Sequence, residues 1–150
     1  MFDNDLPNHL DVAFHEQMIA FIRAFGLHQP DQTPCGQPIP VAEAHALTEL
    51  ARAEPLSQND LVRRLRLEKS TVSRLVGNLL SRGWMERTRD PEDGRAVQLR
   101  LTEQGKQAAA QLIAARSAKF SRMLAALPED QRGQVIQSLK LLVEALREHS

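Results

Sequence analysis

The sequence predicts a mainly α-helical protein with one small β-hairpin. Apolar residues recur at helical spacing over most of the chain, and the pattern changes once to the two-residue repeat of a strand, near position 97. A turn-forming run lies just before that change. At 150 residues the chain has the length of one domain. We therefore expect residues 1–150 to form a single chain in which a compact lobe, residues 41–101, is flanked by further helices.

The central helix of the lobe is expected to begin near Glu68 and to end at Gly83. Its apolar residues recur at i, i+3, i+4, i+7 and i+8, which places them on one face that must be buried: Val72, Leu75, Val76, Leu79 and Leu80. The opposite face carries small or hydrogen-bonding groups, one cation and no carboxylate: Ser70, Ser73, Arg74, Gly77 and Ser81. Such a face is suited to contact with a polyanion.

A β-hairpin is expected directly after this helix. Residues 97–101 alternate apolar and other side chains, as a strand with one covered face does, and residues 85–89 supply a partner strand. Residues 90–94 contain the Pro and Asp-Gly of a hairpin loop, flanked by Arg87, Arg89 and Arg95. This is the layout of a winged helix-turn-helix, whose helix enters the major groove while the hairpin reaches the adjacent backbone or minor groove.

Five helices are expected around this pair of elements. The first runs from Asp11 to Phe25 and closes at Gly26, and a proline-rich loop follows to Pro40. The second spans residues 41–52 and is broken by Pro55; a short third helix, to about Arg66, starts at a capping-box-like Ser57–Asp60. A long helix capped by Thr102 continues to Leu127, and Pro128 is expected at the first position of the last helix.

The terminal helices are expected to mediate self-association. Four of the five phenylalanines lie by residue 25, and the last helix has a narrow apolar seam with steps of four, three and four residues, at Val135, Leu139, Leu142 and Leu146. We therefore interpret residues 10–26 and 102–149 as dimerisation helices.

Charge is sorted along the chain although the formal net charge is zero. Residues 57–100 hold ten cations and six anions, a net of +4, whereas residues 1–56 hold two cations and eight anions, a net of −6. The positive part coincides with the predicted helix and hairpin, which favours nucleic acid as a partner. The acidic start does not resemble a signal peptide, no apolar run is long enough for a membrane span, and a cytoplasmic protein is expected.

Other chemistry has weaker support. The chain lacks a Gly-x-Gly-x-x-Gly run, a phosphate loop and a His-Glu-x-x-His motif, so neither an enzyme nor a cofactor is predicted. The lone Cys35 excludes an internal disulfide but leaves open a redox-active thiol. Cys35, Glu43 and His45 leave open a metal site, although their spacing matches no common zinc motif. A winged helix used only for contact with protein is a further alternative.

The block from Leu67 to Gly105 resembles the signature of the MarR family of transcriptional regulators. The resemblance is carried by the run from Ser70 to Val76, by Arg82-Gly83, by Asp90-Pro91 and Asp93-x-Arg95, and by Leu101-Thr102-x-x-Gly105. It implies a homodimer that binds a palindromic operator and a repressor released by a small-molecule effector, whose identity and binding residues stay unknown.

Residue roles follow from the same resemblance. It implies that Ser70, Thr71, Ser73 and Arg74 contact the major groove and that Arg95 enters the minor groove from the wing tip, with Arg87 and Arg89 beside it. It also implies that Asp93 holds Arg95 by a charge-assisted hydrogen bond. Oxidant sensors of the family resemble one another in having a cysteine in the first helix, where this chain has none.

Overall fold

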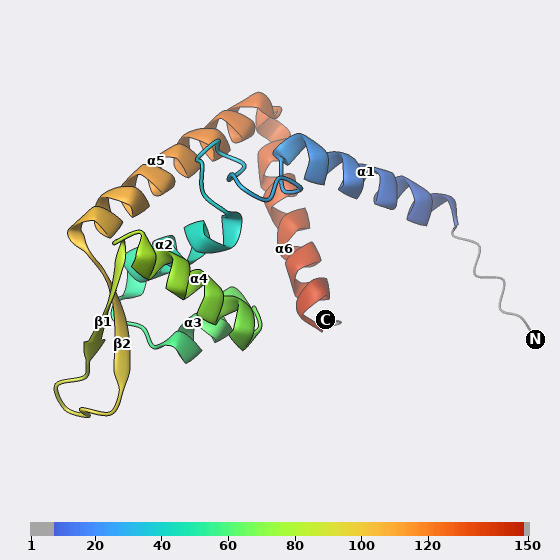
Figure 1. Ribbon diagram of the computed structural model, residues 1–150. Helices are drawn as coiled ribbons and strands as arrows, with labels where there is room; N and C mark the ends of the chain where they lie inside the picture. The colour runs from blue at the N-terminus through green and yellow to red at the C-terminus, as the bar shows by residue number, and fades with distance from the viewer. Residues whose placement is uncertain (1–7, 149–150) are drawn as a thin grey trace, which may run out of the picture. The chain divides into compact units, whose positions relative to one another are not determined.

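The computed structural model describes residues 8–148, and the chain divides after Ile113 into two compact units. The first unit holds α1 (His9–Phe25), α2 (Val41–Ala53), α3 (Gln58–Leu65), α4 (Lys69–Ser81), β1 (Met85–Arg89) and β2 (Val97–Leu101) (Figure 1). The long helix α5 (Glu103–Ala126) begins in the first unit; η1 (Glu129–Gln131) and α6 (Arg132–Glu148) belong to the second. The mainly α fold with one hairpin is confirmed. The acidic start and the last position of the predicted segment 102–149 lie outside the described residues.

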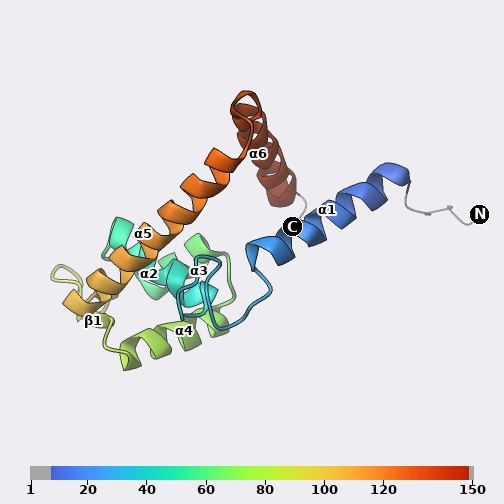
Figure 2. The ribbon, with the colours of Figure 1, turned by 90° about the horizontal axis from the view of Figure 1, so that it is seen from above.

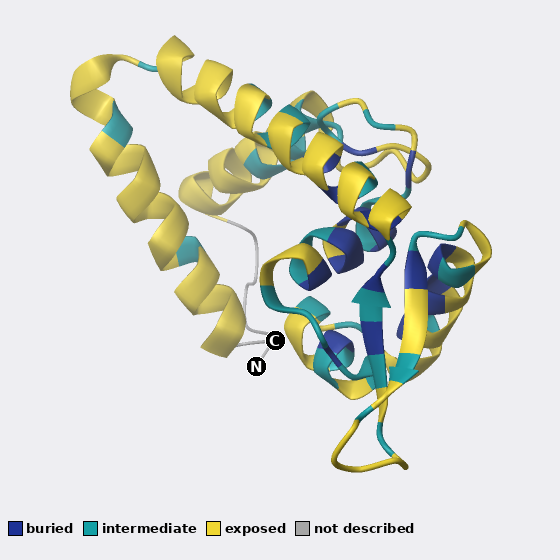
Figure 3. Cartoon of the chain, turned by 90° about the vertical axis from the view of Figure 1, so that its left-hand side faces the viewer, coloured by how far each residue is buried: buried dark blue, intermediate teal, exposed yellow. Residues whose placement is uncertain are grey.

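The hydrophobic core lies in the lobe formed by α2, α3, α4 and the hairpin, where Figure 3 shows the buried residues gathered together. Its largest fully buried side chains are Leu47, Leu50, Leu61, Leu79, Leu99, Val72 and Val76. Burial of each such aliphatic side chain contributes about 1.5–3 kcal/mol relative to exposure. The core also takes in Ile39, Ala109 and Leu112, which lie beyond the predicted lobe limits of 41 and 101.

Local capping explains where the first and third helices begin. Ser57 accepts from the Asp60 amide at 3.0 Å and Asp60 accepts from the Ser57 amide at 2.9 Å, so the predicted capping box is confirmed. Asn8 and Asp11 form a second capping box, and α1 therefore starts two residues before the predicted Asp11. At its other end Gly26 has a left-handed φ of 91°, as expected for a helix-ending glycine.

The hairpin is antiparallel and pairs Met85 with Leu101 and Arg89 with Val97. A third segment joins it: Leu56 forms a bridge with Leu99, with N···O distances of 2.7 and 3.2 Å. Leu99 and Leu101 are buried as predicted, but Val97 is 49% exposed. The covered face thus ends before the hairpin loop, where no core residue lies against the strand.

The start of α5 is locked to the end of the α4–β1 connection. Thr102 caps the helix by accepting from the Gly105 amide at 3.1 Å, and its hydroxyl donates to the Gly83 carbonyl at 2.6 Å. The Thr102 amide donates to the Trp84 carbonyl at 3.1 Å. Gly105 is buried against that carbonyl, and a Cβ atom at this position would lie 1.8 Å from the Trp84 oxygen.

The second unit differs in one detail from the expected pattern. Pro128 was expected at the first position of the last helix, but it precedes the 3-10 turn η1 with ψ of 135°, and α6 begins only at Arg132. Proline fixes φ alone and is therefore compatible with both positions. Among the described residues, no helix combines the length and hydropathy needed to cross a membrane.

Candidate nucleic-acid interface

The outer face of α4 is polar and exposed as predicted. Ser70, Ser73 and Arg74 are exposed and Thr71 is half-buried, while Val72 and Val76 on the opposite face are fully buried. Seen from above, α4 runs along one side of the lobe, with α2 and α3 next to it (Figure 2). The helix therefore presents one cation and several hydroxyl groups to solvent on a face that nothing else in the lobe covers.

The turn between α3 and α4 is short and well defined. Arg66 adopts a left-handed φ of 55°, and the Leu67 amide donates to the Val62 carbonyl at 3.4 Å. α4 then begins at Lys69. This tight connection is the one that a helix-turn-helix requires, so α3 and α4 form that motif with α4 as its recognition helix.

Three arginines near the motif are paired with carboxylates. Arg63 pairs with Asp60, and both Arg64 and Arg52 reach Glu49 at 3.2 Å. The backbone hydrogen bond from Ser57 lowers the pKa of Asp60, and its side-chain hydrogen bond and the nearby arginines act in the same direction. In contrast, no ion pair engages Arg74, Arg87, Arg89 or Arg95 within residues 8–148. These four cations are available for an external anion.

The wing, residues 85–101, ends in a seven-residue loop from Asp90 to Ala96 that is held by short-range hydrogen bonds. Asp90 accepts from the Glu92 amide at 2.9 Å, and Arg89 donates to the Gly94 carbonyl at 3.3 Å. Gly94 does not adopt a positive φ, so the Asp-Gly pair does not form the tight two-residue turn that such a pair favours. Figure 3 shows this loop projecting from the lobe with its tip exposed.

Asp93 supports Arg95 through its backbone. Its Oδ1 accepts from the Arg95 backbone amide at 3.1 Å, and its carbonyl accepts from Ala96 at 3.0 Å. Within the described residues no ion pair joins Asp93 to the Arg95 guanidinium, so the charge-assisted hydrogen bond that was expected between the two residues is made to the Arg95 amide. The carboxylate fixes the backbone on which Arg95 stands and leaves the guanidinium exposed.

An ion pair with one buried partner lies at the C-terminal end of α4. Glu43, in the first turn of α2, is 5% exposed, and its Oε1 lies 3.7 Å from Nε of Arg82, the residue after α4. Desolvation by burial raises the pKa of Glu43, and the nearby Arg82 charge opposes that shift. The Arg82 guanidinium lies over the Trp84 ring, 5.1 Å from its centroid. Trp84 itself is half-buried and packs against the core, as predicted.

The thiol and metal alternatives find no support here. Cys35 is half-buried, and its Sγ lies 2.9 Å from the hydroxyl of Thr33 in the loop before α2. In residues 8–148 no group of three or more His, Cys, Asp or Glu side chains is placed to hold a metal ion. These residues therefore give no support to a site built from Cys35, Glu43 and His45. The helical register explains this, because Glu43 is buried whereas His45 is exposed.

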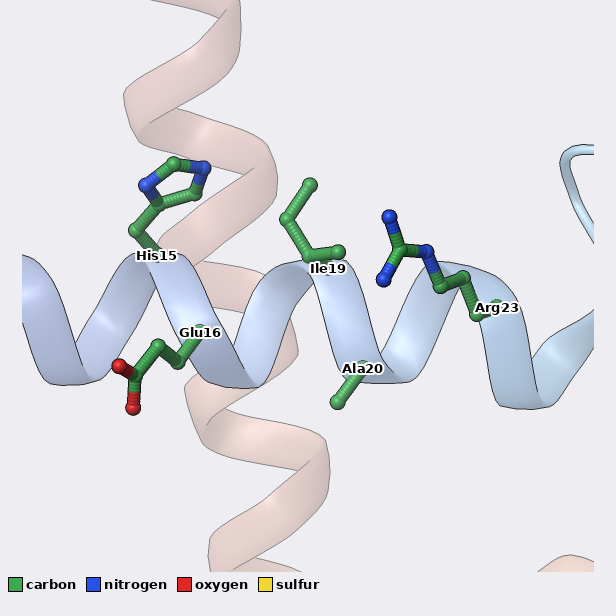
Figure 4. A pocket seen from close by; sticks show the side chains of 5 residues that line it. All are labelled: His15, Glu16, Ile19, Ala20 and Arg23. Atoms are coloured by element: carbon green, nitrogen blue, oxygen red, sulfur yellow. The ribbon is translucent and has the colours of Figure 1, made fainter.

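A hollow along α1 is lined by His15, Glu16, Ile19, Ala20 and Arg23. In Figure 4 the side chains of His15, Ile19 and Arg23 stand on one side of the helix, and those of Glu16 and Ala20 on the other. The same helix exposes large apolar side chains, including Phe14 at 53% and Phe21 at 46%. Helix α1 is thus amphipathic over most of its length, and none of its residues belongs to the hydrophobic core of the lobe.

Sequence reasoning missed several residues of this region. Lys69 and Asn78 are exposed on the outer face of α4, and a projection at 100° per residue places Asn78 next to Arg74. Glu54 accepts from the Leu101 amide at 3.0 Å and so fixes the end of β2 to α2. The ion pair between Glu43 and Arg82 carried no sequence signal, because the two residues lie far apart in the chain, one in α2 and the other directly after α4.

The α3–α4 motif, the uncovered polar face and the arginine-bearing hairpin together define a winged helix-turn-helix lobe. The MarR family model matches residues 37–96. The chain is 39% identical over 61 residues to the HTH-type transcriptional regulator YdgJ of Bacillus subtilis, a match that covers 41% of this chain and 37% of that protein. It is 27% identical over 113 residues to an HTH-type transcriptional regulator of Mycobacterium tuberculosis, covering 75% and 78% of the two chains.

Solved structures share the fold. Streptococcus pneumoniae FabT, in complex with DNA, matches with a TM-score of 0.69 and 20% identity over 94% of each chain. The PcaV transcriptional regulator of Streptomyces coelicolor matches with a TM-score of 0.71 and 23% identity, over 91% of this chain and 98% of that one. The solved structures thus show that the chain shares the fold of these regulators, and the MarR family model matches its winged helix-turn-helix lobe.

Proposed function

We propose that this protein is a sequence-specific DNA-binding repressor that acts as a homodimer on a palindromic operator. The observation that carries the proposal is the exposed polar face of α4, with Arg74 at its centre, beside the wing. Among residues 8–148 no carboxylate pairs with the wing arginines Arg87, Arg89 and Arg95. Ser70, Thr71 and Ser73 would join Arg74 in the major groove, where bidentate arginine contacts read guanine. Asp93 would hold the backbone under Arg95 while that side chain reaches the minor groove.

A gel-shift or anisotropy titration against the DNA flanking the protein's own gene tests this proposal. Specific binding should exceed binding to unrelated DNA by at least about a thousandfold. A protein that uses its winged helix only for contact with other proteins would bind both DNAs weakly and equally. Release by a small molecule, which we propose from the match to the MarR family model, would appear as weakened operator binding on addition of the effector.

Arg95→Ala should weaken binding to operator and unrelated DNA by similar factors. A wing arginine contributes mainly by charge, so its loss releases fewer counterions and should reduce the slope of log affinity against log salt by about one. Titrations at several salt concentrations measure both effects. Glu92→Gln, which removes a carboxylate from the same loop, is the matched control and should leave affinity equal or higher. Unchanged affinity and slope in Arg95→Ala would contradict the assigned role of the wing.

Apolar side chains on the terminal helices support the homodimer. On α6, Leu139 is 49% exposed, Leu141 56% and Leu146 66%, and on α1 Leu10 is 76% exposed. The second half of α5 adds Phe120 at 48%. Extended helices that expose this much apolar surface require a partner, and a second copy of the chain supplies the same surface through two-fold symmetry.

Leu139→Glu should dissociate the dimer. A charge placed in an apolar interface costs at least about 1 kcal/mol per subunit, and symmetry doubles that cost, so the dimer dissociation constant should rise about 30-fold or more. Sedimentation equilibrium should give twice the chain mass of 16.8 kDa for the unmodified protein and a concentration-dependent fall for the variant. Gln137→Glu, on an exposed polar position of the same helix, should stay dimeric. A monomeric unmodified protein at micromolar concentration would refute the dimer.

A further inference from the structure

The carboxylate of Glu43 is buried without a hydrogen bond to its Oε1 atom. The side chain stands in the first turn of α2 and is 5% exposed, and its one charged neighbour among the ion pairs of the described residues is Arg82, at 3.7 Å. Buried carboxylates are normally satisfied by hydrogen bonds, because an unsatisfied buried acceptor has lost its hydration without replacement. This acidic group therefore differs from the half-buried Glu49 on the same helix, which accepts hydrogen bonds from Arg52 and Arg64.

Arg82 connects the buried carboxylate to the root of the wing. It follows directly after α4, where its amide donates to the Asn78 carbonyl at 3.0 Å, and its guanidinium lies over the Trp84 ring. Trp84 directly precedes β1, and its carbonyl accepts from Thr102 at the start of α5. A chain of contacts from Glu43 through Arg82 to Trp84 thus joins the start of α2 to the point where the recognition helix passes into the wing.

The charge of Glu43 contributes little to folding. Burial raises the pKa of the carboxyl group more than Arg82 lowers it, so the ionised form is less favourable in the folded lobe than in water. An ion pair that includes a buried charge is weak evidence for stability, because replacing such charges by neutral groups of similar size often leaves the stability unchanged. The carboxylate instead orients Arg82, because its negative charge attracts the guanidinium toward the lobe, where the guanidinium lies over the indole ring.

We propose that Glu43 is a positioning residue for DNA recognition, and that it fixes the angle between α4 and the wing by holding Arg82 against Trp84. The proposal rests on the DNA-binding function proposed above. The recognition helix and the wing must meet two different parts of the duplex at once, and the only covalent connection between them is the three-residue segment from Arg82 to Trp84. A fixed guanidinium at that segment limits the rotation of one element against the other.

The direction in which Glu43→Gln changes operator affinity distinguishes a positioning role from a general electrostatic effect. Removing a negative charge from a DNA-binding lobe should strengthen binding if charge alone mattered. We expect binding to the operator to weaken about three- to tenfold, because the amide cannot hold the guanidinium by charge. The melting temperature should stay equal or rise. Glu49→Gln removes the same charge from a half-buried position of α2, where it pairs with Arg52 and Arg64, and should leave operator affinity equal or higher.

Trp84 provides an independent readout, since it is the only tryptophan of the chain. Its fluorescence in the free protein should change in Glu43→Gln, which releases the guanidinium from the ring, and in Arg82→Gln, which removes it. It should stay the same in Glu49→Gln. The double variant Glu43→Gln/Arg82→Gln should bind the operator no more weakly than Arg82→Gln alone. Additive losses, or unchanged fluorescence in Glu43→Gln, would overturn the positioning role.

The two proposals fail in different ways. If the unmodified protein shows no preference for any DNA flanking its gene, the proposed function is wrong. If the unmodified protein binds its operator and Glu43→Gln binds it equally well or better, only the positioning role of Glu43 is wrong. Loss of operator binding together with a lower melting temperature in Glu43→Gln would also overturn it, because it would make Glu43 a structural residue.

Discussion

Gly105→Ala is expected to destabilise the lobe by about 3 kcal/mol or more, the upper range for overpacking a rigid site. The added Cβ would lie 1.8 Å from the carbonyl oxygen and 2.8 Å from the carbonyl carbon of Trp84, and both are backbone atoms that no rotamer change can move. Relief requires α5 to shift away from the wing root. That shift breaks the hydrogen bond from the Thr102 amide to the same carbonyl.

Thermal unfolding followed by circular dichroism measures this loss, which should lower the melting temperature by roughly 10 °C. Gly77→Ala is the matched control, because it makes the same substitution in a helix of the same unit where nothing lies within 4 Å of the new Cβ. It should raise stability by up to about 1 kcal/mol through helix propensity. Equal melting temperatures for the two variants would show that α5 does not approach the Trp84 carbonyl this closely.

Arg74→Ala should weaken operator binding by about 1–3 kcal/mol, or about 5- to 150-fold. Arg74 is exposed on the recognition helix and has no carboxylate partner in the described part of the chain, so truncation removes a contact to DNA without leaving a buried charge behind. A bidentate contact to guanine would concentrate the loss on the operator. Anisotropy titrations with operator and unrelated DNA distinguish this from a phosphate contact.

Arg52→Ala is the control for the loss of a cation from the same lobe. Its side chain is 73% exposed on α2, pairs with Glu49 and lies outside the proposed interface. It should change operator affinity by less than about twofold, since exposed ion pairs of this kind contribute little. An equal loss for operator and unrelated DNA in Arg74→Ala would assign Arg74 to the backbone, and no loss would remove α4 from the interface.

The elements that the sequence predicts well are those set by neighbouring residues. The buried face of α4, the capping box of α3 and the two strands depend on side chains within a few positions of one another, and the structure confirms all three. The polar face of α4 followed from the same periodicity. The roles of its residues in DNA recognition are predictions.

The features that escaped prediction depend on residues far apart in the chain. The Glu54 carboxylate accepts a hydrogen bond from the Leu101 amide, 47 positions away. Glu43 in α2 pairs with Arg82, which follows α4. Strand periodicity placed Val97 with Leu99 and Leu101, but only packing could show that the core ends before it. The contact of Asp93 with the Arg95 amide depends on the loop conformation, which residue types alone do not fix.

The bridge between Leu56 and Leu99 anchors the wing below its loop, so the tip from Asp90 to Ala96 carries no part of the hydrophobic core. Such a tip can be exchanged for a different loop without altering the core. Even doubling its length should cost only about 0.6 kcal/mol in loop closure, which leaves the lobe free to accept tips of other lengths and charges. Grafting the tip of a relative onto this base should therefore alter the groove contact while the protein stays folded.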